Sequence, residues 1–206
     1  MSGFIRTTYN RPMRKTGLFV LLLSALAISA SAQQRPASPP GASATQVNGR
    51  WIEITYGRPI LRGRTAIFGS GADYARTLND GGPVWRAGAN DTTLLRTEVP
   101  LEIGGRRVAQ GDYAMLIELR GPQQWTFILS SQARQRSFDP DNTTELWGGF
   151  NYRPDNDVTR APMQVETIPF VVDQLTWVFT DVTPAGGNMR ISWANMMATV
   201  PFKILN

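Results

Sequence analysis

Two residue types that carry much of enzyme chemistry are missing from this sequence. Its 206 residues include no cysteine and no histidine. Catalytic mechanisms of the Ser-His-Asp or Cys-His type, and zinc sites built on thiolate or imidazole ligands, therefore cannot form within one chain. No disulfide can stabilise the fold, so the core must do so. An enzyme made from this chain would rely on carboxylates, tyrosines, Lys203 or an oxygen-ligated metal.

An excess of positive charge is also missing once the N-terminal segment is set aside. The sequence has 21 basic and 16 acidic side chains and a pI near 10.1. Four of the basic and none of the acidic side chains lie in residues 1–32, which leaves 17 basic against 16 acidic in the rest. The high pI therefore gives no support to a nucleic-acid partner.

Residues 1–32 have the three parts of a secretory signal peptide. A basic start is followed by an apolar-to-small run over residues 17–28 and by small residues up to Ala32. The 12-residue run is shorter than the roughly 20 residues that cross a bilayer. No cysteine is present to carry a lipid anchor. We expect cleavage near Ala32, a periplasmic or extracellular protein, and no transmembrane span in the mature chain.

After the expected cleavage point the composition changes twice. Residues 33–43 contain Pro36, Pro39 and Pro40 among small residues, which predicts a flexible leader. From Ala44 onward apolar and polar residues alternate with period two, as in half-buried strands. Residues 44–206 are therefore expected to form one domain.

The alternating stretches are short and are separated by turn residues. They cover residues 52–56, 113–119, 125–129, 175–179 and 189–193. Gly104-Gly105 and residues 184–188 predict tight hairpins, and residues 73–78 suggest a short helical turn. This pattern predicts an all-β fold, an antiparallel β-sandwich that is jelly-roll-like or a partly open barrel.

Tryptophans are the largest side chains that such a core must place. Alternation puts Trp125, Trp177 and Trp193 on apolar faces, where they are expected to pack between sheets. Trp51 alternates with polar residues, and Trp147 lies in a glycine-flanked loop. For these two, burial and exposure to a ligand both stay open.

Two segments place arginines beside glycines. Residues 56–64 contain Arg58 and Arg64, and residues 84–90 contain Arg86 and Asn90. Glycine lets the backbone approach closely, while a guanidinium offers a charged, planar fork of donors. If these side chains converge, they form a site for a carboxylate, phosphate or sulfate group, with Asn90 adding a directional hydrogen bond.

The same arginines have a purely structural alternative, in which they pair internally and fix loops to the rim of the sandwich. The carboxylates that could pair with Arg58 and Arg86 are Glu53, Asp91, Glu98 and Asp112.

Acidic residues give no metal or catalytic prediction. Asp139, Asp141, Asp155 and Asp157 lie among asparagines and prolines, as in ordinary turns, without the spacing of a calcium loop. Glycoside hydrolysis needs two carboxylates about 5–10 Å apart. Nothing in the sequence brings any two of the strand glutamates together, so no catalytic residue, cofactor or metal site is predicted.

Several motifs resemble a bacterial family, the domain of unknown function 2911. They are Tyr56-Gly57-Arg58-Pro59, Gly63-Arg64, Ile67-Phe68-Gly69, residues 84–90 (VWRAGAN), Gly111-Asp112-Tyr113, Trp125, Trp147-Gly148 and residues 200–204. The resemblance implies an exported, single-domain protein and assigns no activity. This chain departs from the family in a longer loop between Gly69 and Pro83.

Three functions remain open at this stage. The first is a non-catalytic exported β-sandwich that binds a small or polymeric ligand, a saccharide or an anion, through Arg58, Arg64, Arg86 and Asn90. The second is a structural or protein-interaction module of the cell envelope. The third is a hydrolase that uses carboxylates.

Overall fold

A computed structural model of the chain describes residue 3, residues 36–79 and residues 82–205. The chain divides into two units, residues 1–34 and residues 35–206, and the second unit is described below. The predicted signal peptide, apart from Gly3, lies outside the described residues. In the part of the chain that the structure describes, no helix has the length and apolar character needed to cross a membrane.

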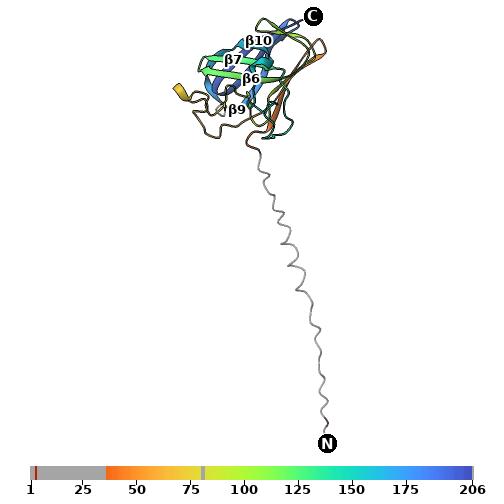
Figure 1. Cartoon of the computed structure of the whole chain (residues 1–206). Helices are drawn as coiled ribbons and strands as arrows, with labels where there is room; N and C mark the ends of the chain where they lie inside the picture. The colour runs from red at the N-terminus through yellow and green to blue at the C-terminus, as the bar shows by residue number, and fades with distance from the viewer. Residues whose placement is uncertain (1–2, 4–35, 80–81, 206) are drawn as a thin grey trace. The chain divides into compact units, whose positions relative to one another are not determined.

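The described residues form two antiparallel sheets, which confirms the predicted all-β sandwich; neither sheet closes into a barrel. The six-stranded sheet has the order β1 (Pro40–Val47), β2 (Arg50–Gly57), β3 (Leu94–Thr97), β6 (Gly111–Gly121), β7 (Gln124–Ser130) and β8 (Asp157–Pro162). The four-stranded sheet has the order β5 (Arg106–Val108), β4 (Leu101–Ile103), β10 (Gly186–Ile204) and β9 (Gln164–Thr183). In Figure 1 the green strands β6 and β7 lie in front of the blue strands β9 and β10.

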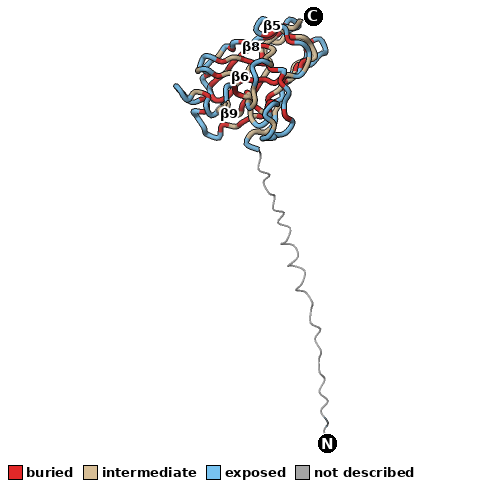
Figure 2. Tube along the Cα trace, in the orientation of Figure 1, coloured by how far each residue is buried: buried red, intermediate tan, exposed pale blue. Residues whose placement is uncertain are grey.

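The alternating sequence pattern forms strands because one face of each sheet is buried. In β2, Ile52, Ile54 and Tyr56 point into the core, while Trp51 on the other face is exposed. The core lies between the two sheets, and Figure 2 shows the buried segments inside a shell of exposed ones. Both predicted hairpins are present, β4–β5 through Gly104-Gly105 and β9–β10 through residues 184–185.

The short helical turn predicted near residues 73–78 corresponds to a run of hydrogen-bonded turns. A single 3-10 turn, η1 (Gly71–Asp73), precedes a series of hydrogen-bonded turns up to Asn79. A second 3-10 turn, η2 (Pro154–Asn156), precedes β8.

Strands β6 and β7 are buried on both faces, which alternation does not predict. Ala114, Leu116 and Ile128 point away from the main core and form a second buried cluster with Val84 and Leu146. The long connection over residues 131–156, which joins β7 to β8, therefore covers part of the outer face of the six-stranded sheet.

The fold begins earlier than residue 44, the boundary expected from composition. Residues 40–43 belong to β1, and the carbonyls of Ala37 and Pro39 accept hydrogen bonds from Ile60 and Arg58. Part of the predicted flexible leader is therefore held in the sheet. Prolines are tolerated there because an edge strand does not need every N–H in its ladder.

One segment after β2 connects the two sheets. Leu61 N–H donates to the carbonyl of Asp173 (2.8 Å), and Leu175 N–H donates to that of Pro59 (3.0 Å). Because Ile60 also pairs with Ala37, residues 59–61 lie between the start of the six-stranded sheet and strand β9. This connection fixes the position of the loop that carries Arg62 and Arg64.

Candidate functional site

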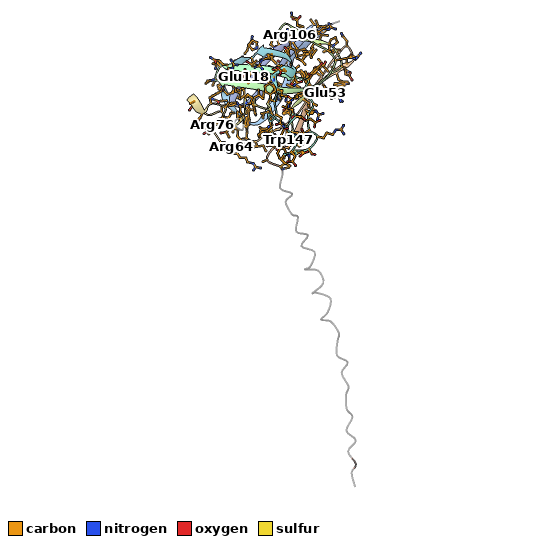
Figure 3. The ribbon with its side chains drawn as sticks, in the orientation of Figure 1. Glu53, Arg64, Arg76, Arg106, Glu118 and Trp147 are labelled. Carbon is orange, nitrogen blue, oxygen red and sulfur yellow. The ribbon has the colours of Figure 1, made fainter. Side chains whose placement is uncertain are left out.

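A cavity of about 460 Å³ lies where the 59–64 loop meets the 85–90 segment. Its volume is within the roughly 300–1,000 Å³ of small-molecule sites. Its described lining consists of Ala37, Ser38, Pro59, Ile60, Arg62, Arg64, Ile67, Thr77, Leu78, Trp85, Arg86, Gly88, Ala89, Asn90 and Trp193. Figure 3 shows the Arg64 side chain at the end of the domain away from Arg106 of β5.

The turn at Arg62-Gly63 brings two arginines to this cavity. Both turn residues have a left-handed backbone, with φ of +51° for Arg62 and +78° for Gly63. Arg64 folds back on the loop, and its Nε and Nη2 donate to the carbonyls of Leu61 and Ile60, both at 2.9 Å. A guanidinium has more N–H donors than these two bonds use, so Arg64 can also serve a ligand. Arg62 makes no hydrogen bond or ion pair with any described residue.

Arg86 is held from two sides. Its Nη1 donates to the carbonyl of Asn90 at 2.5 Å, and its Cζ lies 5.9 Å from the centre of the Phe150 ring. Gly148 has φ of +60°, and its lack of a side chain leaves room for the guanidinium. The orientation of Arg86 is therefore set by its surroundings before any ligand arrives.

Asn90 ends the 85–90 segment in a left-handed conformation with φ of +62°. Asparagine tolerates this region better than most residues because its short side chain can bond locally. Its Nδ2 donates to the carbonyl of Ser38 at 3.0 Å. Gly57 lies so close to the carbonyl of Ala89 that any side chain at position 57 would collide with it.

Arg58 is not brought to the cavity. Its stem packs on Gly41, its Nε donates to the carbonyl of Leu175 (3.3 Å), and its Nη2 donates to Thr176 Oγ1 (3.2 Å). Of the four residues predicted as a ligand site, Arg64, Arg86 and Asn90 share one cavity, whereas Arg58 joins the six-stranded sheet to β9.

The carboxylates expected to pair with these arginines are engaged elsewhere in two cases. Arg96 donates two hydrogen bonds to Asp112, at 2.8 and 3.0 Å, and this contact lowers the pKa of the Asp112 carboxyl. Glu98 lies 3.8 Å from Arg50. Neither carboxylate lines the cavity.

Two tightly packed tryptophans lie at the inner end of the cavity. Trp85 and Trp193 are stacked with ring centres 6.2 Å apart, and Phe68 contacts both rings. Both tryptophans are at most 3% exposed, so the expected burial of Trp193 is confirmed, as it is for Trp125 and Trp177. Trp193 Nε1 is buried and has no hydrogen-bond partner among the described residues.

Trp147, for which the sequence leaves both burial and exposure open, is half-buried. Its ring lies 5.9 Å from that of Phe138. Phe138 is 60% exposed, and Phe150, beneath Arg86, is 46% exposed. A group of solvent-facing aromatic rings thus lies beside Arg86. Trp51 is 44% exposed and belongs to the outer face of β2.

Sequence reasoning missed three contributors to this cavity, namely Arg62, Trp85 and Trp193. Arg62 stands within the arginine-glycine segment, and its following glycine was the available signal. Alternation assigns Trp193 to packing, which is correct since its ring is 3% exposed, but Trp85 and Trp193 also border the cavity.

The donors around this cavity suit an anion better than a cation. Three arginines and an asparagine line it, and none of its described lining residues is acidic. In the described ranges 36–79 and 82–205, no three acidic side chains lie close enough to hold a metal ion. A rim of arginines can bind a carboxylate, phosphate or sulfate group of a ligand.

Comparison with known proteins agrees with the motifs in the sequence. A search of curated proteins and a search of solved structures gave no match. A family model described as protein of unknown function, DUF2911, matches residues 38–202. The match covers the whole sandwich from just before β1 to near the end of β10. The chain therefore belongs to the DUF2911 family.

Proposed function

We propose that this protein is an exported, non-catalytic β-sandwich that binds an anion, either a small molecule or an acidic saccharide. The ligand binds in the cavity formed by Arg62, Arg64, Arg86 and Asn90. The observation that carries the proposal is the convergence of three arginines on one cavity whose described lining has no carboxylate. Export rests on the signal-peptide pattern of residues 1–32.

The restraint of the arginines supports binding. Arg64 is bonded to its own loop, and Arg86 is held by Asn90 and packed against Phe150. Side chains already fixed in place lose less conformational entropy when a ligand arrives. Bonds from guanidinium to carboxylate or sulfate oxygens are also stronger than neutral hydrogen bonds.

The hydrolase that uses carboxylates receives no support from this cavity. Its described lining offers neither Asp nor Glu as an acid or base. Among the described glutamates, Glu118 binds Arg120 and Arg160, and Glu102 binds Lys203. These ion pairs account for both carboxylates as surface structure.

Binding is tested with galacturonate, sulfate and phosphate, with neutral galactose as the control ligand. A ligand held at about 100 times its Kd stabilises the fold by about 2.7 kcal/mol, which a thermal-shift measurement detects. Arg62→Asn removes a charge and keeps a residue that accepts the left-handed backbone. Loss of a charge-assisted bond should weaken anion binding by roughly tenfold to a hundredfold.

Arg106→Ala is the matched control, since it removes an exposed arginine at the other end of the domain (Figure 3). It should leave affinity unchanged. If no anion stabilises the wild-type protein, or if both variants weaken binding equally, the cavity is not an anion site.

The structural or protein-interaction module keeps one specific observation in its favour. In β9 four residues, 168–171, stand opposite the single Asn195 of β10 and form a bulge. Phe170 and Val171 within it are 62% and 68% exposed. Sedimentation measures whether the protein self-associates. Self-association that is abolished by Phe170→Ser, in a protein that binds no anion, would favour this second candidate.

A further inference from the structure

A second groove, of about 660 Å³, adjoins the anion cavity. The two share Ala89 and Asn90, so the 89–90 turn forms the wall between them. The groove runs along the ends of β1 and β2, and its lining includes Asp91, Arg134 and Arg136. A ligand longer than the cavity can therefore cross this turn and continue into the groove.

Positive charge is concentrated along this double site. Its described lining contains five arginines, namely Arg62, Arg64, Arg86, Arg134 and Arg136, and one acidic residue, Asp91. Of the ten described arginines outside this lining, five form ion pairs, namely Arg50, Arg76, Arg96, Arg120 and Arg160. Arg62, Arg64, Arg134 and Arg136 form none with the described residues. Outside this lining, residues 33–206 contain 12 basic and 15 acidic side chains, so the positive excess is local.

Exposed aromatic rings occur in the connection that carries Arg134 and Arg136, although none of them lines the cavity or the groove. Phe150 lies beneath Arg86 of the cavity, and Phe138 follows Arg136 of the groove by two residues. Trp147 touches Phe138. An exposed ring offers an apolar, flat face to the C–H face of a sugar ring, whereas a small inorganic anion has no use for it.

We infer that the ligand is an acidic polysaccharide, a chain of sugar rings that carry carboxylate or sulfate groups, bound across the 89–90 turn with charges in both the cavity and the groove. This inference rests on the proposed anion site and extends it. Each added charged ring that reaches Arg134 and Arg136 binds from an already tethered ligand, so affinity rises with chain length. A neutral saccharide of equal length lacks the charged contacts.

The test measures Kd by calorimetry on the full chain with galacturonate oligomers of one, two, four and six rings. A heparin-derived hexasaccharide tests whether sulfate groups are bound, and a neutral galactan hexamer tests whether sugar rings bind without charge. A dT oligonucleotide tests whether the site binds a nucleic acid instead. We expect the hexamer to bind at least tenfold more tightly than the monomer, and the neutral hexamer not to bind. A stronger response to the heparin fragment identifies sulfate rather than carboxylate as the preferred group.

Two double variants separate the parts of the site. Arg134→Ala with Arg136→Ala should abolish the gain with length and leave the Kd of the monomer unchanged, because both arginines line only the groove. Arg106→Ala with Arg107→Ala removes two exposed charges on β5 and should change neither quantity. Arg62→Asn should weaken monomer and hexamer alike.

The outcomes distinguish this inference from the function on which it rests. If the monomer binds but longer oligomers bind no more tightly, the polysaccharide inference is wrong and the proposed anion cavity still stands. No binding of any anion overturns both. Binding of dT that is tighter than that of either acidic hexamer, with the same loss on changing Arg134 and Arg136, overturns the polysaccharide in favour of a nucleic acid.

Discussion

The guanidinium of Arg86 lies directly over the backbone of Gly148, where an added Cβ would come within 2.5 Å of Cζ. Gly148 belongs to the connection over residues 131–156, and Arg86 belongs to the segment before β3. The cavity arginine is thus positioned by a loop some 60 residues further along the chain.

Gly148→Ala should therefore displace Arg86 as well as strain the backbone. The left-handed φ of +60° alone costs an alanine on the order of 1–2 kcal/mol. The collision adds to this cost, and the affinity for galacturonate should fall with it. Melting temperature and Kd are the two measurements.

Gly49→Ala is the control for this change. Gly49 has a similar φ of +75°, but nothing lies within 4 Å of its would-be Cβ. Gly49→Ala should therefore lose only the stability that backbone strain costs, and its affinity for galacturonate should be unchanged. Equal losses of stability and of affinity in both variants would mean that the contact with Arg86 plays no part.

The Arg96–Asp112 pair gives a pH dependence with a definite sign. The hydrogen bonds from Arg96, strengthened by its charge and that of Arg134, lower the pKa of Asp112 in the folded state. The pair therefore stabilises the fold above the unfolded pKa of about 3.9, and this contribution disappears as pH falls to the lowered value. Since both side chains are about half exposed, solvent screening keeps this effect small.

Urea unfolding at pH 6 and at pH 3 measures that contribution. In Asp112→Asn the decrease in unfolding free energy between these two values should be smaller than in the wild type. An unchanged decrease would assign acid sensitivity to other carboxylates.

Much of the fold follows from the sequence because burial on one face imposes period two. Ile52, Ile54 and Tyr56 are buried, as predicted, and Gly104-Gly105 makes its hairpin. Ala114 and Leu116 depart from the pattern because the 131–156 connection covers their face. Burial of this face depends on where an irregular loop packs, and the local alternation of apolar and polar residues does not predict that.

The candidate site could be predicted only in part for a similar reason. Glycines beside Arg64 and Arg86 indicate that the backbone comes close and that these arginines lie at turns. They do not reveal the direction of each side chain, which long-range contacts decide. Arg58 turns to β9 because Leu175 and Thr176 offer it acceptors, whereas Arg62 points to the cavity.

Two buried tryptophans, one with and one without a hydrogen-bond partner, allow the contribution of one hydrogen bond to the unfolding free energy to be measured. Trp177 Nε1 donates to the carbonyl of Ala87 at 2.9 Å, while Trp193 Nε1 has no partner among the described residues. Changing either to Phe removes similar volume. Trp177→Phe also leaves the carbonyl of Ala87 unsatisfied, which costs about 1–3 kcal/mol more.

The unfolding free energies of Trp177→Phe and Trp193→Phe, compared by urea titration, measure this difference. Trp193→Phe should be the milder change, since it also removes a buried donor that lacks an acceptor. A larger loss in Trp193→Phe would show that its indole nitrogen has an acceptor such as a buried water.

Of the three arginines predicted from the sequence to bind a ligand, Arg58 is the one that serves the structure of the fold and not the cavity. Arg58→Ala removes its bonds to Leu175 and Thr176 and the packing of its stem on Gly41. Bonds from charged donors contribute roughly 1.5–3 kcal/mol each when well formed. Because these are long, at 3.3 and 3.2 Å, a total loss of about 1–3 kcal/mol is expected. The attachment of β1 and β2 to β9 should weaken with it.

Arg58→Met keeps most of the stem and should recover part of the stability, because long basic side chains also stabilise through their apolar portion. Both variants should bind galacturonate with wild-type Kd at a temperature where they stay folded, since Arg58 does not line the cavity. Arg62→Asn should show the opposite behaviour, with little change in melting temperature and a clear loss of affinity. If Arg58→Met stays as stable as the wild type and loses the ligand, Arg58 acts in binding and its contacts with β9 are incidental.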